Sequence, residues 1–148
     1  MKKIPNFTLS LIDGSILKSS AITSKTILFF YPKAMTPGCT VEVNEFQSNL
    51  NKFQKLGFTI IGCSKDSIKN NIKFAEKYKL RYLLGSDLTN VCEKLGIWVE
   101  KFMYGKKYFG IERTTIMIDS NGKLFQQWNK VKVKDHVREV LEIAKNCP

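Results

Sequence analysis

The fold is decided by the stretch Thr26-Ile-Leu-Phe-Phe-Tyr31 and its continuation Pro32-Lys-Ala-Met-Thr36-Pro-Gly-Cys39, where an apolar β-rich run passes into a helix start. Thr36 is predicted as the N-cap and Pro37 as the first helical residue. Cys39 then lies in the first turn, where unpaired amides and the positive end of the helix dipole favour an anion. Thiols in such positions ionise at roughly 3.5–7.5 instead of about 8.5. The pattern predicts a reactive thiolate, with a buried packing cysteine as the alternative.

The rest of the chain alternates predicted strands and helices. Phe7–Ile12 and Ser15–Leu17 around Asp13-Gly14 predict an N-terminal hairpin, and the nearly all-apolar run 58–63 predicts a central parallel strand. This order predicts a three-layer α/β fold compatible with a thioredoxin-like sheet. The other expected strands lie at 26–31 and 80–84, and a hairpin is expected from Glu112–Ile118 and Lys123–Trp128 around Asn121-Gly122. A helix is expected after Cys39, with Val43, Phe46, Leu50 and Phe53 on one face, and a lysine-bearing helix is expected to bury Ile68, Ile72, Ala75 and Tyr78. The last two expected helices lie at 87–95, with Leu88, Val91, Cys92 and Leu95 inward, and near 134–146.

Length and composition indicate one globular domain over residues 1–148. Hydrophobic residues make up 43% and charged residues 25%, which is ordinary for a soluble protein. The N-terminal residues lack the continuous apolar segment of a signal peptide, and no run approaches the ~20 apolar residues of a membrane span. A cytoplasmic location without membrane contact is therefore the expectation.

The net charge of +11 is unusual and raises the question of an acidic partner. Lysines recur at every fourth position, which predicts a stripe on one helix face: Lys65, Lys69, Lys73 and Lys77. A solvated helix face is the simpler interpretation, and contact with nucleic acid or an anionic surface is the alternative. Because the basic residues are scattered and no recognised nucleic-acid motif accompanies them, no nucleic-acid partner is expected.

The cysteine and histidine content argues against a metal site. The four cysteines, at positions 39, 63, 92 and 147, form no Cys-x-x-Cys pair, and His136 is the one histidine. His136 lies beside the apolar face of the last predicted helix and has no partner in sequence. We interpret it as an ordinary helix-surface histidine, and we expect neither a metal nor an organic cofactor.

The motif Pro32-x-x-x-Thr36-x-x-Cys39 resembles the active-site signature of the peroxiredoxins, which are thiol peroxidases. The fuller string Phe30–Thr40 is similar to the bacterioferritin comigratory protein (peroxiredoxin Q) branch, and the stretches Ile60–Ser67 and Trp98–Asp119 agree with it. This resemblance spans nearly the whole chain. It implies a thioredoxin-like fold, a hydroperoxide substrate, and a reductant that is thioredoxin, a glutaredoxin or a small thiol. Members of this branch tend to be monomers, so a monomer is expected.

The resemblance also implies roles for individual residues. Cys39 would be the nucleophile, and its first product would be a sulfenic acid. Arg113 begins an apolar strand, where a buried cation needs an explanation; by the family pattern it stabilises the thiolate and donates to the peroxide. Its alternative is a strand-end salt bridge with Glu112. Thr36 would orient thiolate and peroxide through its hydroxyl, and Pro32 would shield the pocket from water.

One departure from the family pattern concerns the second cysteine. Many members of this branch carry it five residues after the first, but Asn44 occupies that position here, so the usual disulfide cannot form. Cys63 and Cys92 read as core residues and Cys147 as a mobile residue near the chain end, and all three remain possible resolving cysteines. We favour an enzyme that works with Cys39 alone and is reduced by an external thiol.

Two further features have alternative interpretations. Glu42, one turn beyond Cys39, is either a weaker site candidate or an exposed first-turn acid that suits the helix dipole. The segment Trp98–Gly110 mixes aromatic residues with lysines; it resembles the family's loop beside the active site, although stacking platforms for single-stranded nucleic acid have a similar composition. The alternative function is therefore a basic thioredoxin-like binding module without turnover.

Overall fold

A mixed sheet forms the centre of the molecule, and the computed structural model describes the chain over residues 2–148. Strands β4 (Thr26–Phe30), β5 (Thr59–Ser64) and β6 (Leu83–Ser86) are parallel to one another, and the remaining neighbours pair antiparallel. The thioredoxin-like α/β fold expected from the sequence is confirmed. Within the described residues the sheet has eight strands in the order β1 (Lys2–Lys3), β10 (Lys123–Trp128), β9 (Thr114–Ile118), β4 (Thr26–Phe30), β5 (Thr59–Ser64), β6 (Leu83–Ser86), β2 (Thr8–Leu11) and β3 (Ile16–Lys18).

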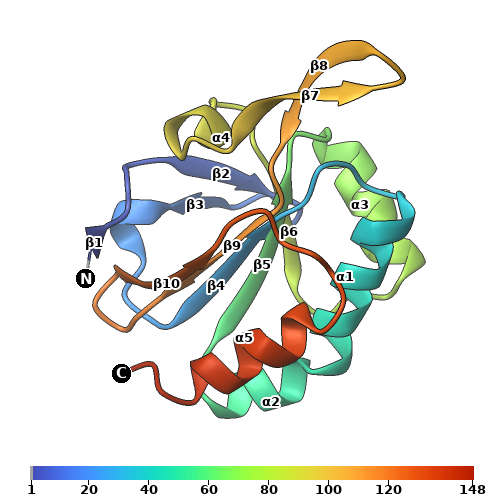
Figure 1. Cartoon of the computed structure of the whole chain (residues 1–148). Coiled ribbons are helices and arrows are strands. Elements are labelled where there is room, and N and C mark those ends of the chain that lie inside the picture. Colours follow the sequence, from blue (N-terminus) through green and yellow to red (C-terminus); the bar gives the residue numbers. More distant parts are fainter. Residues whose placement is uncertain (1) are drawn as a thin grey trace.

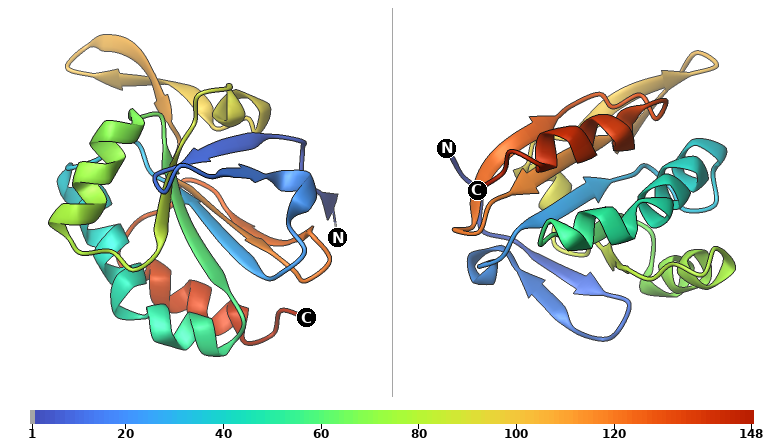
Figure 2. Two further views of the ribbon diagram at one scale, coloured as in Figure 1. Left: turned by 180° about the vertical axis from the view of Figure 1, so that it is seen from behind. Right: turned by 90° about the horizontal axis from the view of Figure 1, so that it is seen from below.

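Two apolar clusters cover the two faces of the sheet. All residues of β4 are buried, and they alternate between the clusters as the twofold repeat of a strand requires. Ile27 and Phe29 pack with the helices, whereas Leu28 and Phe30 face the side that carries β2. The helices of the first cluster are α1 (Pro37–Ser48), α2 (Leu50–Lys55), α3 (Ile68–Lys77) and α5 (His136–Ala144). Figures 1 and 2 show these helices gathered away from β2 and β3.

A second, two-stranded sheet stands apart from the central one. Strands β7 (Trp98–Met103) and β8 (Lys106–Ile111) form an antiparallel hairpin, which projects from the body of the molecule (Figure 1). Its turn, Tyr104-Gly105, has positive φ at both residues, 53° and 74°. Such turns match the twist of the flanking strands, so the segment forms a regular hairpin rather than a loop.

The predicted hairpins at both ends of the chain are confirmed, but the elements between residues 80 and 95 differ from the prediction. The strand begins at Leu83, and the helix contracts to α4 (Val91–Lys94). Asp87 explains this contraction, because its carboxylate accepts hydrogen bonds from the amides of Val91 (2.8 Å) and Cys92 (2.9 Å) and therefore precedes the helix. The prediction that Leu88 faces inward is wrong, since this side chain is exposed.

The predicted lysine stripe is shorter than expected. Ser67 is the N-cap of α3, and its side chain accepts a hydrogen bond from the Asn70 amide at 3.1 Å, so Lys65 lies before the helix. The Lys65 ammonium is instead paired with Asp87 at 3.2 Å and Glu93 at 2.8 Å. The stripe on α3 consists of Lys69, Lys73 and Lys77, all exposed.

The buried face of α3 also differs in part from the expectation. Ala75 is buried as predicted, while Ile68, Ile72 and Tyr78 are half-buried at its edge. The face is centred on Phe74 and Asn71, which are completely buried. No helix within residues 2–148 is long and apolar enough to cross a membrane.

His136 is buried, so its interpretation as a helix-surface residue is wrong. It is the first residue of α5, and its Nε2 is hydrogen-bonded to the Thr115 hydroxyl of β9 at 2.8 Å. The rings of Phe46 and Trp128 contact it edge-on. Burial, with a smaller contribution from the charge of Arg113, lowers the pKa of His136 to about 4. The neutral imidazole is therefore the form that the fold accommodates.

This burial predicts an acid sensitivity. Because the folded pKa lies below the usual value of about 6.5, the unfolded chain binds more protons between these values, and stability falls as the pH drops through this window. Relative to His136→Gln, the wild type should lose about 1–2 kcal/mol of unfolding free energy between about pH 7.5 and pH 5. Urea titrations of both proteins at each pH measure the difference. Identical pH dependence in the two proteins would contradict this account.

Candidate active site

Cys39 is presented by the loop between β4 and α1. Thr36 has an extended backbone, Pro37 is the first helical residue, and the Thr40 amide donates to the Thr36 carbonyl at 2.9 Å, so the predicted helix start is confirmed. The Thr36 hydroxyl does not cap the helix; it donates to the Lys33 carbonyl at 2.7 Å. The Thr36 side chain therefore accepts no hydrogen bond from the first-turn amides of α1. Its hydroxyl instead joins two residues of the loop and restricts the loop's conformation.

A polar network at the carboxyl ends of the parallel strands anchors this loop. The Asp66 carboxylate, just beyond β5, accepts hydrogen bonds from the Ala34 amide at 2.8 Å and from the Ser64 hydroxyl at 2.7 Å. Asn71 of α3 contacts Ser64 and accepts a 2.6 Å hydrogen bond from the Tyr31 hydroxyl. The loop is therefore held at its start and its middle by groups that follow the neighbouring strand.

Arg113 lies against the sulfur of Cys39. Its Nη2 donates to Sγ at 3.3 Å, and its Nη1 donates to Oε1 of Glu42 at 2.6 Å. The register between β4 and β9 pairs Phe30 with Thr114, which brings Arg113 to the strand end that precedes the Cys39 loop. Cys39 and Glu42 are completely buried one turn apart on α1, so both face the guanidinium. The alternative salt bridge of Arg113 with Glu112 is wrong, as is the exposed placement of Glu42.

The charges in this cluster shift one another's pKa. Burial raises the pKa of Glu42 to about 7, although the charge and hydrogen bond of Arg113 act in the opposite direction. Its second oxygen, Oε2, has no hydrogen-bond partner among the described residues. Burial disfavours the charge of Arg113, but Glu42 and Cys39 raise its pKa above the usual value. The guanidinium is thus a permanent cation beside the sulfur, and its partner carboxyl titrates near neutral pH.

Lys101 is a further cation near the site that the sequence interpretation did not single out. Its Nζ donates to the Ile111 carbonyl at 2.6 Å, and its chain crosses Gly110. Burial and the neighbouring charge of Arg113 lower its pKa, while the charge of Glu112 and, to a smaller extent, Cys39 act in the opposite direction. The sequence does not show that Lys101 lies near Arg113, because this proximity depends on how the β7–β8 hairpin is placed relative to the central sheet.

A cavity of about 680 Å³ lies between the Cys39 loop and the hairpin. Pro32 and Thr36 line it from the loop, whereas Cys39 and Arg113 are not among its lining residues. Trp98, Tyr108 and Phe109 of the hairpin form an aromatic wall on its other side. The remaining lining residues are Lys33, Lys65, Asp66, Lys101, Met103 and Gly110. The cavity therefore combines an apolar wall with several lysines.

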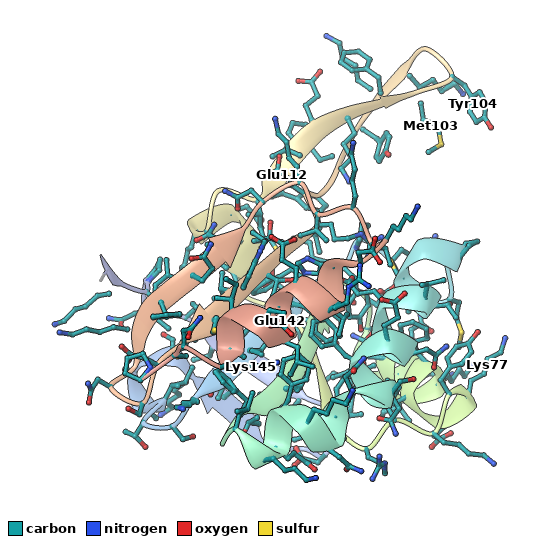
Figure 3. All side chains as sticks on the ribbon, turned by 60° about the horizontal axis from the view of Figure 1, so that its bottom comes forward. Lys77, Met103, Tyr104, Glu112, Glu142 and Lys145 are labelled. Carbon is teal, nitrogen blue, oxygen red and sulfur yellow. The ribbon has the colours of Figure 1, made fainter. Side chains whose placement is uncertain are left out.

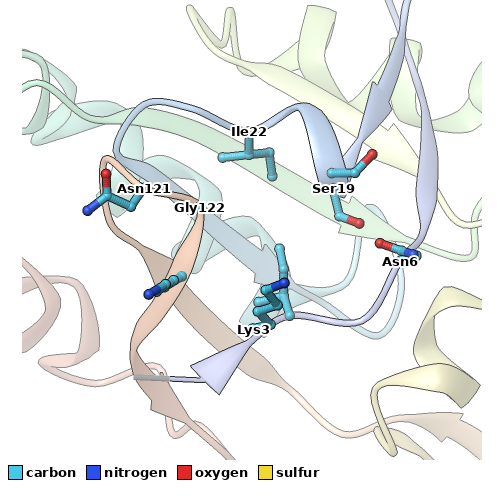
Figure 4. Close-up of a pocket in the computed structure, with 9 residues that line it drawn as sticks. Lys3, Asn6, Ser19, Ile22, Asn121 and Gly122 are labelled. Atoms are coloured by element: carbon cyan, nitrogen blue, oxygen red, sulfur yellow. The ribbon is translucent and has the colours of Figure 1, made fainter.

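Another cavity, shown in Figure 4, is lined by Lys3, Asn6, Ser19, Ile22, Asn121, Gly122 and their neighbours. None of its lining residues carries a thiol or a carboxylate. It adjoins the Asn121-Gly122 turn, at the opposite end of β9 from Arg113. Within residues 2–148, no three histidine, cysteine or acidic side chains are grouped to hold a metal ion.

The other three cysteines are all buried free thiols. Cys63 in β5 and Cys92 in α4 belong to the cluster on the opposite face of the sheet from Cys39. Burial raises the pKa of both thiols, and Asp87 raises that of Cys92 further. Cys147 is buried as well, so its expected mobility is wrong. It follows α5 beside Pro148, whose carbonyl accepts from Ser120 beyond the far end of β9.

These features define the class of the protein: a thioredoxin-like fold with a buried cysteine in the first turn of α1 and an arginine against its sulfur. The AhpC/TSA family model matches residues 1–127. The chain is 44% identical to peroxiredoxin Bcp of Bacillus subtilis over 98% of its own length and 94% of that protein, and 38% identical to peroxiredoxin Bcp of Escherichia coli over 95% and 92%. A structure of Xanthomonas campestris peroxiredoxin Q has a TM-score of 0.88 and 38% identity, covering 95% of this chain and 90% of that one. The chain belongs to the peroxiredoxins of the AhpC/TSA family, of the Bcp (peroxiredoxin Q) type.

The ion pair between Arg113 and Glu42 predicts a large effect on stability. Glu42→Ala leaves a mostly buried guanidinium without its counter-charge, so the unfolding free energy should fall by about 3 kcal/mol. The measurement is a urea titration at about pH 8, where the Glu42 carboxyl is ionised. Glu142→Ala, which removes an exposed pair with Lys145, is the matched control and should cost no more than about 0.5 kcal/mol. Equal effects of the two substitutions would disprove a special role for the buried pair.

Proposed function

We propose that this chain is a cytoplasmic thiol peroxidase that reduces hydrogen peroxide and organic hydroperoxides with Cys39 as its nucleophile. The supporting observation is the 3.3 Å hydrogen bond from Arg113 to the buried sulfur of Cys39. A fixed cation and the amide end of α1 both favour the thiolate, which is the reactive form. The X. campestris bacterioferritin comigratory protein, whose structure is 37% identical to this chain, has alkyl peroxide reduction activity, which agrees with an organic substrate.

The proposed reaction is an in-line displacement at the peroxide bond. The thiolate electron pair forms an S–O bond with one peroxide oxygen while the O–O bond breaks. The other oxygen leaves with the bonding pair and takes up a proton, which gives water or an alcohol, and Cys39 becomes a sulfenic acid. Negative charge moves from sulfur to the leaving oxygen, so a guanidinium that contacts both is favourably placed to stabilise the transition state.

The surrounding residues have distinct proposed roles. Arg113 binds the sulfur and the peroxide, and Glu42 positions the guanidinium through its 2.6 Å hydrogen bond. Thr36 already donates its proton to Lys33, which leaves its oxygen lone pairs available to accept a hydrogen bond from the peroxide. Pro32 forms part of the cavity wall and restricts water at this side.

For the second half of the cycle we propose a one-cysteine mechanism. Asn44 occupies the usual position of the resolving cysteine, and Cys63 and Cys92 are buried in the cluster on the opposite face of the sheet from Cys39. Cys147 shares a cluster with Cys39, but its neighbour Pro148 is hydrogen-bonded to Ser120, beyond the end of β9 that lies opposite Arg113. The thiolate of thioredoxin, a glutaredoxin or a small thiol would attack the sulfenic sulfur, release water and form a mixed disulfide. A second thiol would then reduce that disulfide and restore Cys39.

The mass of the protein after oxidation tests this mechanism. One equivalent of hydrogen peroxide should add one oxygen, and a sulfenic-acid trap should label Cys39. The combined variant Cys63→Ser, Cys92→Ser, Cys147→Ser should behave like the wild type, and Cys39→Ser should remain unchanged. Loss of two hydrogens in the wild type would refute the one-cysteine mechanism, and peptide mapping would identify the resolving thiol. An unchanged wild-type mass would refute the peroxidase itself, as would peroxide consumption by Cys39→Ser.

The role of Arg113 has its own test. Arg113→Lys keeps a positive charge but loses the two-pronged contact with Cys39 and Glu42, so the rate constant for oxidation by peroxide should fall by about a hundredfold. Stopped-flow measurement under single-turnover conditions isolates this step. Arg138→Lys, an exposed arginine of α5, is the control and should retain the wild-type rate. A fall of less than about threefold in Arg113→Lys would remove Arg113 from the mechanism.

A further inference from the structure

The tip of the β7–β8 hairpin exposes a cluster of large apolar side chains. Tyr104 is 97% and Phe102 is 67% exposed, and Met103 between them is also exposed. These three consecutive residues, which we call the hairpin tip, belong to neither apolar cluster of the body. Figures 1 and 3 show the hairpin reaching beyond the body, with Met103 and Tyr104 at its outer end. Contiguous apolar groups in such a position mark an interaction surface.

Cations accompany the hairpin tip. Lys106 and Lys107 begin β8 directly after the turn and are exposed. Glu100 is the acidic residue of the hairpin, and it lies 3.6 Å from the Lys107 ammonium, so it offsets one charge. The hairpin therefore has an apolar end with Lys106 and Lys107 next to it, and we call these two lysines the positive collar.

The surface at the base of the hairpin is also basic. The loop 129–134 lies beside it, because the Val131 amide donates to the Arg113 carbonyl at 2.9 Å. This loop carries three exposed lysines: Lys130, Lys132 and Lys134. Lys33 contributes from the cavity wall, whereas the charge of Lys65 beside it is offset by Asp87 and Glu93. Although basic residues are scattered over the sequence, the fold brings many of them to the end of the molecule from which the hairpin projects.

We propose that the hairpin tip binds an anionic lipid surface, with Phe102, Met103 and Tyr104 entering the interfacial region and the lysines contacting the headgroups. Met103 also lines the cavity beside the Cys39 loop, but the outer end of the hairpin is convex and can enter a deformable interface. Tyrosine favours that depth, and lysine side chains extend from it toward water. The positive collar and the chain's charge of +11 complement an anionic surface.

Nucleic acid and an acidic protein are the competing occupants. Stacking of single-stranded nucleic acid uses aromatic faces along a basic groove. The aromatic rings of the hairpin that meet this description, Trp98, Tyr108 and Phe109, line the cavity and do not belong to the tip. The ring of Phe102 is, moreover, already contacted by the Lys107 ammonium at 5.8 Å. A protein partner would need a recess that fits the tip, and a bilayer needs none. The lipid surface is therefore the occupant that the geometry favours.

Vesicle co-sedimentation with the full chain tests this proposal. The protein should bind vesicles containing phosphatidylglycerol, bind phosphatidylcholine vesicles much more weakly, and dissociate as salt is raised. The variant Phe102→Ser, Tyr104→Ser should weaken binding by about tenfold or more. Ile16→Ser is the matched control, because Ile16 is 62% exposed near the N-terminal turn, and it should bind like the wild type.

The contribution of charge is separated by a second pair of variants. Lys106→Gln, Lys107→Gln should weaken binding to phosphatidylglycerol, whereas Lys77→Gln, Lys145→Gln removes the same charge far from the tip (Figure 3) and should have a smaller effect. Thermal unfolding midpoints verify that all variants are folded.

The proposal is overturned if the wild type does not bind phosphatidylglycerol vesicles, if the tip variant binds as well as the wild type, or if the two lysine pairs have equal effects. Binding to single-stranded DNA or to an acidic protein without vesicle binding would assign the tip to that occupant instead. None of these outcomes depends on peroxidase activity, so the two proposals can fail separately.

Discussion

The contact between Arg113 and the sulfur of Cys39 depends on the pairing of β4 with β9, and the rest of the site is arranged around it. These two strands are antiparallel and buried along their whole length, so their register is fixed by the core. A slip of one residue would exchange side chains between the two apolar clusters and move the guanidinium away from the thiol. Glu42 then completes the arrangement, because it lies one turn after Cys39 on the same buried helix face.

The local part of the site is predictable from the sequence because it depends on neighbouring residues. A strand followed by a proline at the first helical position is sufficient to place Cys39 in the first turn. The burial of Glu42 is not predictable in the same way, since it requires Arg113, 71 positions later in the chain. His136 was misinterpreted for the same reason, because its partner Thr115 is on another element. Lys65 continues a four-residue repeat in the sequence, but the N-cap at Ser67 excludes it from the helix.

The fold class was predictable because alternating apolar runs identify the layers, while the relation of the second sheet to the first was not. Lys65 contributes to that relation: it is paired with Asp87 and Glu93 of the body, and its ammonium lies 4.8 Å from the ring centre of Trp98 at the base of the hairpin. Such cation–π contacts are stabilising when partly desolvated. One wall of the cavity therefore depends on a lysine that the sequence pattern placed on a helix face, either solvated or in contact with an anionic partner.

The complete burial of the Cys39 sulfur has a consequence for the timing of the catalytic cycle. A hydroperoxide is small, whereas a protein reductant must bring its own sulfur into line with the buried one. Such an approach requires the first turn of α1 or its loop to open, against the Asp66–Ala34 hydrogen bond and the packing of the turn. A hydroperoxide and a protein reductant therefore meet different steric obstacles at the same sulfur, and the obstacle is greater for the protein.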